Sequence, residues 1–265
     1  MKTPAFLLFF ACVLLITAEP AGSQIYSASE CKKTGDPSIA AKIKSGKIEK
    51  LSWMGRWHLG LYICGWSTSF LPPTGTAPKC PDNLEELPDW ESIESDYQEK
   101  LEKWSCMYSA RSAMDSDPRT AWCEGKKDNG IGEILLVKVD TSRHVKIWAG
   151  LGASPALHKK NSRPKRVRVY VLQAKKAGKD IGQYATIIRY QDIIVLGSRE
   201  YILSDINGYQ NLPLPKHTRN NSVENSSTHR GEPVKIADTT FVAIEILSVY
   251  PGTKYRDTCI SEVMN

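Results

Sequence analysis

The sequence lacks the short motifs that mark common enzyme classes. It holds no nucleophile elbow, no P-loop, no dinucleotide-binding glycine fingerprint and no zincin helix. Its 5 histidines show no catalytic spacing; they are His58, His144, His158, His217 and His229. We therefore expect a protein without catalytic residues that is not an enzyme.

Long apolar runs are also missing, except at the start of the chain. Lys2 precedes an apolar run over residues 6–18 and a short region of small and polar residues. This pattern predicts a secretory signal over residues 1–24, too short to span a bilayer with any margin. Cys12 lies inside the apolar run, so we do not expect a lipoprotein. We expect a secreted, extracellular or cell-surface protein with no transmembrane segment.

The spacing of a zinc site is absent as well. No C-x-x-C pair occurs, and no histidine stands at zinc-ligand spacing. Removal of Cys12 with the signal leaves six of the 7 cysteines, and an even number in an exported chain predicts disulfides. Spacing does not choose among the roughly 15 possible connectivities of Cys31, Cys64, Cys80, Cys106, Cys123 and Cys259.

The charge is only moderately basic. The chain carries 35 Lys and Arg against 29 Asp and Glu, a formal charge of +6. Such a charge favours anionic partners weakly and does not identify them. A mature chain of about 240 residues fits one large β domain or two smaller units.

The segment over residues 113–125 combines turn formers, carboxylates and a large aromatic. Asp115, Asp117 and Thr120 offer oxygen ligands at close spacing, which suits a hard cation such as Ca²⁺. Trp122 gives the turn an apolar anchor. The spacing is equally compatible with a turn that satisfies its own hydrogen bonds without metal.

This segment reads A-x-D-x-D-P-x-T-A-W-C-E-G, and Gly-Ile-Gly-Glu follows at 130–133. It resembles the opening of a discoidin-like (coagulation-factor C-type) β-sandwich, of the type found as the non-catalytic, glycan-binding domain of bacterial NAD-glycohydrolase toxins. Further stretches match in order, at residues 161–171, 242–246 and 249–262. The resemblance covers about 106–265 and does not extend to 25–105.

The resemblance implies a jelly-roll fold with specific pairings. Cys123 and Cys259 would join the two ends of the sandwich, and the other four cysteines would pair among themselves. A structural Ca²⁺ would be held by Asp115, Asp117, Thr120 and Glu262. The toxin relatives carry their NAD-cleaving activity on a separate domain, so the resemblance does not imply an activity for this chain.

Residues 25–105 are predicted to form a small disulfide-stapled region before the sandwich. A short helix is expected over 37–44, followed by a tryptophan-rich stretch that we interpret as core. A second helix begins after Asp89, and Trp90, Ile93 and Tyr97 start an apolar stripe along it. We expect this amphipathic helix to pack on the sandwich or on the aromatic stretch.

The remainder is predicted to be mainly β. Strands are expected over 134–139, 145–148, 167–172, 184–190, 193–196 and 241–247, which are short and rich in β-branched and aromatic residues. In the third, Val167, Val169 and Val171 alternate with Arg166, Arg168 and Tyr170, so one face should be buried and the other solvated.

Two loops hold the candidate ligand-binding residues, because binding residues concentrate on loops. In the loop over 149–163, His158, Asn161 and Arg163 could bind a sugar or an anionic group, or could merely hold the loop. In the loop over 205–233, Tyr209 is a candidate for stacking on a ligand.

We interpret the chain as a binding protein that recognises a cell-surface or matrix glycan. The alternative is an adhesin or assembly module that binds a surface protein through the sandwich and the helix at 89–104. A third hypothesis places an enzyme site within 25–105. Nucleic acid is not an expected partner, because a solvated edge strand explains the basic run over 159–168.

Overall fold

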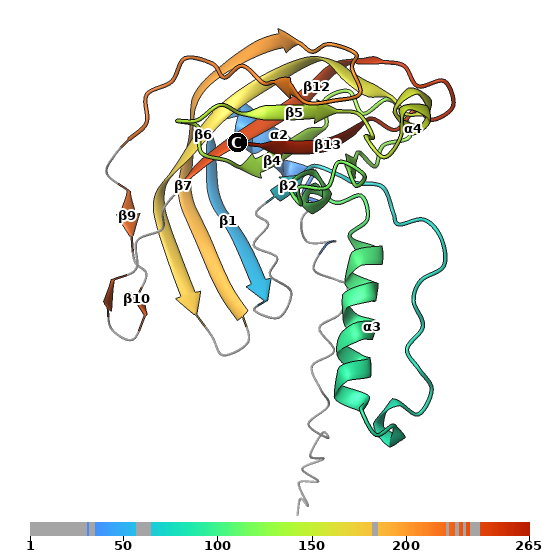
Figure 1. Ribbon diagram of the computed structural model, residues 1–265. Helices are drawn as coiled ribbons and strands as arrows, with labels where there is room; N and C mark the ends of the chain where they lie inside the picture. Colours follow the sequence, from blue (N-terminus) through green and yellow to red (C-terminus); the bar gives the residue numbers. More distant parts are fainter. Residues whose placement is uncertain are drawn as a thin grey trace, which may run out of the picture.

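The computed structural model describes residues 31, 35–56, 65–181, 185–220, 223–225, 228–229, 232–233 and 239–265. Two sheets form the body of this part of the chain, one of seven strands and one of four, and they are antiparallel apart from one short strand (Figure 1). The expected mainly β sandwich is therefore confirmed. The predicted signal at 1–24 and Cys64 lie outside the described residues.

The larger sheet has the order β1-β7-β6-β12-β4-β2. Its strands are β1 (Lys47–Arg56), β7 (Ala185–Ile202), β6 (Arg163–Ile181), β12 (Thr240–Tyr250), β4 (Ile134–Lys138) and β2 (Gly65–Ser67). A short strand, β9 (Glu224–Asn225), pairs with β6 in parallel. The smaller sheet has the order β3-β13-β5-β8, with β3 (Trp122–Cys123), β13 (Cys259–Met264), β5 (Lys146–Ala149) and β8 (Gln210–Asn211).

The remaining elements are short, apart from one helix. The strands β10 (Thr228–His229) and β11 (Glu232–Pro233) form a hairpin of their own. The helices are α2 (Ser38–Lys44), α3 (Trp90–Ser105) and α4 (Pro155–Lys160), with 3₁₀ turns at η2 (Leu84–Glu86) and η3 (Ala110–Ala113).

The main core lies between the two sheets. Val167 and Val169 of β6 meet Ile147 of β5 and Ile260 of β13 there, and all four are fully buried. Trp122 is also fully buried and donates its indole N–H to the Ser69 carbonyl at 2.9 Å. The apolar anchor predicted for the turn is thus part of the core.

Part of the outer face of the larger sheet is buried as well. Tyr170, Tyr190 and Phe241 form a second apolar cluster with Ile39 and Ile43 of α2. The prediction that Tyr170 faces water is therefore wrong, although the inward side of β6 is as expected. The continuous apolar runs at 134–137 and 241–244 indicate this burial on two faces, since strands with one wet face alternate.

The N-terminal region contributes to the sheet that it was expected to precede. β1 pairs with β7 from Lys47↔Ile194 to Arg56↔Ala185, and β2 pairs with β4. Lys44 of α2 also makes an ion pair of 2.7 Å with Glu245, a buried residue of β12. A boundary at residue 105 therefore does not separate the sandwich from what precedes it.

The β6–β7 hairpin differs from the prediction in two ways. The strands predicted at 184–190 and 193–196 form one continuous strand, β7, which contains Asp192 at a positive φ of 50°. β6 lies between β7 and β12, so its basic residues do not mark an edge strand. Arg168 pairs instead with Glu200 and Glu245 across the neighbouring strands.

α3 forms where it was predicted but does not pack as expected. Figure 1 shows it standing apart from the sheets, and within the described part of the chain none of its residues is buried. At its C-terminal end, the Trp104 indole donates to the Thr74 carbonyl at 3.0 Å. The expected packing of its stripe on the sandwich is therefore wrong.

Two disulfides are present among the described residues. Cys123 pairs with Cys259, as the family resemblance implied, and Cys31 pairs with Cys106. Cys80 is exposed and free, so the expectation that all four N-terminal cysteines pair is wrong for Cys80. Cys31–Cys106 joins the N-terminal segment to the residues that open the sandwich.

The Cys123–Cys259 bridge should be a major source of stability. It spans a sequence separation of 136, for which chain entropy gives a stabilisation of about 5 kcal/mol before strain. Replacing both residues by serine should lower the free energy of unfolding, measured in urea, by up to about 5 kcal/mol. Cys80→Ser should change it little. Peptide mapping without reduction should recover the Cys123–Cys259 link, and finding either cysteine free would contradict this topology.

Candidate functional site: an aromatic pair beside an oxygen-rich turn

The turn after η3 gathers oxygen atoms around one hydroxyl. Thr120 Oγ1 lies 2.9 and 2.8 Å from the two Asp115 carboxylate oxygens, 2.9 Å from the Asp117 carbonyl and 3.2 Å from the Ser112 carbonyl. A threonine hydroxyl has a single hydrogen to donate. Most of these oxygens therefore face the hydroxyl oxygen without a proton between them.

Glu262 of β13 brings a second carboxylate to this turn. It is fully buried, and within the described residues neither of its oxygens makes a hydrogen bond of ordinary geometry. Burial and the neighbouring Asp115 carboxyl raise the pKa of Glu262 to about 8, against a smaller lowering by the backbone amides of Asp117 and Ser116. An unpaired buried carboxylate is costly unless a cation or proton compensates it.

The oxygen set fits a hard cation, with one correction to the expected ligands. Carboxylate, carbonyl and hydroxyl oxygens are what Ca²⁺ prefers. The Asp117 carboxylate, however, accepts three bonds of 2.7–3.1 Å from the Arg119 guanidinium. Only the backbone carbonyl of Asp117 points to Thr120. Across the described ranges no three His, Cys, Asp or Glu side chains converge on one point.

His158, Asn161 and Arg163 hold loops together instead of facing solvent. Arg163 donates to the Asp205 carboxylate at 2.9 and 2.6 Å and to the Asn161 and Pro251 carbonyls. Their relative exposures are only 4%, 7% and 7%. Of the two readings of these residues, the structural one agrees with their burial, and ligand contact by them stays a prediction.

His158 and Arg163 pack closely against the backbone of this segment. His158 Nε2 lies 3.1 Å from the Ala149 carbonyl, and burial lowers the pKa of this imidazole. Gly150 has a φ of +116°, and a Cβ there would lie 2.5 Å from Arg163 Cγ. The loop predicted over 149–163 is therefore a packed structure that contains α4, capped by Ser154, whose hydroxyl accepts from the Leu157 N–H at 3.1 Å.

Tyr209 is the predicted ligand-binding residue that remains available. It is 39% exposed and meets Trp148 of β5 edge to face, with ring centroids 5.0 Å apart. The Trp148 indole donates to Asn207 Oδ1 at 3.2 Å, and a Cβ on Gly152 would lie 2.8 Å from the indole ring. The pair is thus held on two sides.

The aromatic pair and the oxygen-rich turn are neighbours. Glu262 pairs with Trp148 across the β13–β5 ladder. The pKa of the Tyr209 phenol is raised, chiefly by burial and then by the charges of Glu262 and Asp115. Sequence reasoning missed Trp148 because it reads as a strand residue; its alternation with buried Ile147 is the signal that places it on the outer face.

Comparison with known families identifies this sandwich. A family described as the NAD glycohydrolase translocation F5/8 type C domain matches residues 89–265. The chain belongs to this family. The match confirms the resemblance to a discoidin-like sandwich and begins earlier than expected, at the start of α3.

Other comparisons add little. Two cryo-EM structures of the arabinofuranosyltransferase AftD from Mycobacteria show 12% and 13% identity, with TM-scores of 0.34 and 0.30. The similarity covers 81% and 76% of this chain but only 11% of each AftD chain. No curated protein matches. In the described part of the chain, no helix has both the length and the apolar character to cross a membrane.

The structural role of Arg163 can be tested by stability. Arg163→Ala leaves a carboxylate and two carbonyls without their donor, and should lower the free energy of unfolding by about 2–3 kcal/mol. Arg119→Ala is the matched control, because it removes a bidentate pair whose arginine side chain is 78% exposed and should cost under about 1 kcal/mol. Equal losses in urea denaturation of the two variants would contradict this assignment.

Proposed function

We propose that this chain is a secreted or cell-surface, non-catalytic module that binds carbohydrate on its outer β5–β8 surface. The Trp148–Tyr209 pair carries this proposal. Tyr209 is exposed and Trp148 is half-buried. Surface aromatic rings with a polar handle are well suited to contact a ligand that is apolar on one side and polar at its edges, as a sugar ring is. The membership of a discoidin-like family supports a binding role but not a particular ligand.

Rigidity also supports recognition at this pair. The Asn207 amide and the Gly152 backbone brace the indole, so little side-chain entropy is lost when a ligand binds. Tyr209 stands next to a loop pinned by the Arg163–Asp205 ion pair of 2.6 Å. On this proposal, the buried polar residues act by positioning the aromatic pair.

A glycan array tests the proposal. Trp148→Ala and Tyr209→Ala should each weaken binding to the array ligand about tenfold or more, since each removes a large contact surface. Tyr255→Ala is the matched control, because Tyr255 is 38% exposed but lies on another loop. A ligand bound equally well by all three variants would move the site elsewhere on the molecule.

The second candidate function is protein binding through α3. The apolar stripe begins at Trp90, which is 37% exposed, and in the described part of the chain its further residues are at most half-buried. A silent array from folded protein, with crosslinks to a surface protein that map to α3, would favour this alternative over carbohydrate binding.

We also propose that the oxygen-rich turn holds a structural Ca²⁺ through Asp115, Thr120, Glu262 and the Ser112 and Asp117 carbonyls. The ion would neutralise the buried Glu262 and tie the first turn of the sandwich to its last strand. Its role would be to fix the scaffold under Trp148 and Tyr209.

Calcium should therefore raise the melting temperature of protein stripped with EDTA. At about 100 times its Kd, the ion should add about 5–10 °C. Asp115→Asn should abolish most of this rise. Asp117→Asn should retain it, since that carboxylate is already paired with Arg119. An unchanged melting temperature after verified stripping would remove the ion from this account.

A further inference from the structure

A cleft of about 430 Å³ lies at the opposite end of the β5–β8 ladder from the aromatic pair. Residues 141–145, which lead into β5, form one wall, and residues 211–217, which begin with the last residue of β8, form the other. Arg143, His144, Lys216 and His217 line it, and no Asp or Glu does. Three of these four residues are exposed, and His217 is half-buried.

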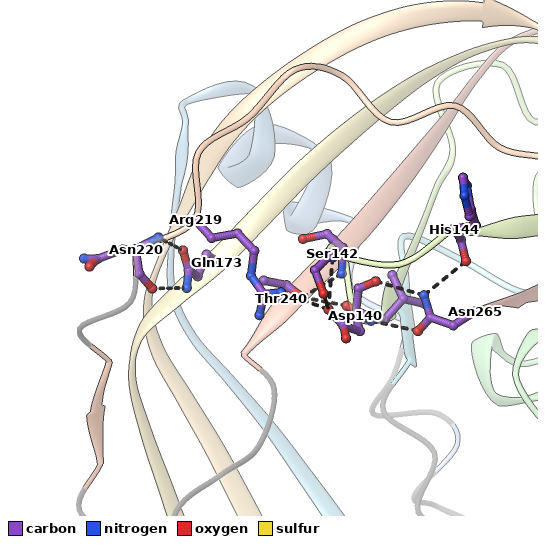
Figure 2. A network of polar contacts seen from close by, with 10 residues as sticks. Asp140, Ser142, His144, Gln173, Arg219, Asn220, Thr240 and Asn265 are labelled. Carbon is purple, nitrogen blue, oxygen red and sulfur yellow. Dashed lines mark hydrogen bonds and ion pairs between the residues drawn. The ribbon is translucent and has the colours of Figure 1, made fainter.

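The first wall is held in place by a polar network (Figure 2). Asp140 accepts from the Ser142 backbone and hydroxyl and from Arg219 at 2.9 Å. Asn265 accepts from the Asp140 N–H at 2.9 Å and donates to the Asp140 carbonyl at 2.9 Å. Asp140, which directly precedes the first wall, is thus already paired with Arg219.

The four basic side chains of the cleft lie outside that network. Figure 2 shows the His144 ring directed away from Asp140, with only its carbonyl joined to Asn265. His217 Nδ1 lies 2.8 Å from the Pro215 carbonyl, and because a carbonyl only accepts, Nδ1 carries the proton. Thr141 also lines the cleft, and its buried hydroxyl lacks a hydrogen-bond partner among the described residues.

The cleft and the aromatic pair share one outward face. Burial alternates along residues 144–149, so that His144, Lys146 and Trp148 face outward while Val145, Ile147 and Ala149 are buried. Lys146 pairs with Asn211 of β8 and stands between the two ends. At about 3.4 Å per strand residue, His144 and Trp148 are about 14 Å apart.

We propose that the glycan recognised by this chain is acidic, and that its carboxylate or sulfate group binds in the cleft at Arg143, His144, Lys216 and His217. This inference rests on the proposed function, since it assumes that a sugar ring lies on Trp148 and Tyr209. The Thr141 hydroxyl would donate to the same group. Lys146 would attract the part of the glycan that lies between the aromatic pair and the cleft.

Binding of defined polysaccharides to the full chain tests the inference. The probes are a heparin oligosaccharide, which carries sulfate and carboxylate, hyaluronan, which carries carboxylate alone, and neutral dextran. The variant is Arg143→Ala with Lys216→Ala, and both residues are exposed. The control is Lys127→Ala with Arg256→Ala, which removes the same charge from exposed positions outside the cleft.

The cleft variant should bind at least one acidic probe about tenfold more weakly or worse, because charge-assisted hydrogen bonds are lost. The control should lose less than about twofold. Heparin bound without hyaluronan would assign the cleft to sulfate; binding of both would assign it to carboxylate. Equal losses in variant and control, no loss in the variant, or no binding of acidic probes by the parent protein would overturn the inference.

These failures are distinct from failure of the proposed function. A neutral glycan on the array that requires Trp148 and Tyr209, with no acidic probe bound, would sustain carbohydrate binding and overturn the acidic ligand. Binding of an acidic probe that needs Arg143 and Lys216 but neither aromatic residue would instead sustain the cleft and overturn the role of the aromatic pair.

Discussion

The smaller sheet depends on its last strand, β13. This strand lies between β3 and β5. β3 is only two residues long, and among the described strands it pairs with β13 alone. Cys259 begins β13 with the disulfide to Cys123, Glu262 brings a buried carboxylate to the oxygen-rich turn, and Asn265 follows the strand and fixes the wall of the basic cleft. Each candidate site is therefore built against one short segment at the end of the sandwich.

The larger sheet provides a base for the sandwich because its central strands are buried on both faces. One face packs on the smaller sheet, and the other is covered by α2 and by Trp66 of β2. The ion pair between Lys44 and the buried Glu245 fixes this cover to β12. The smaller sheet and its loops are left to meet solvent, which is where recognition residues can act.

Sequence reasoning found the strands, the α3 helix and, through the family resemblance, the Cys123–Cys259 pair, because these depend on local periodicity or on a shared pattern. It could not tell whether His158, Asn161 and Arg163 face a ligand or the interior. Polar residues in a glycine-rich loop have the same local signature in both cases. Arg163 is held by the carboxylate of Asp205, which is 42 residues away in the sequence. No local pattern reveals a pairing of that kind.

The same distinction explains how the site is divided between buried and exposed residues. A buried charge must be paired, so the buried Arg163 guanidinium uses its hydrogen bonds on the exposed Asp205 carboxylate and on two carbonyls. An exposed charge such as Arg143 retains its donors, and an exposed ring such as Tyr209 retains its edge and face. Because buried residues such as Arg163 hold the backbone still, the exposed side chains of β5 and β8 keep a fixed spacing. A fixed spacing lets a surface select one ligand geometry over another.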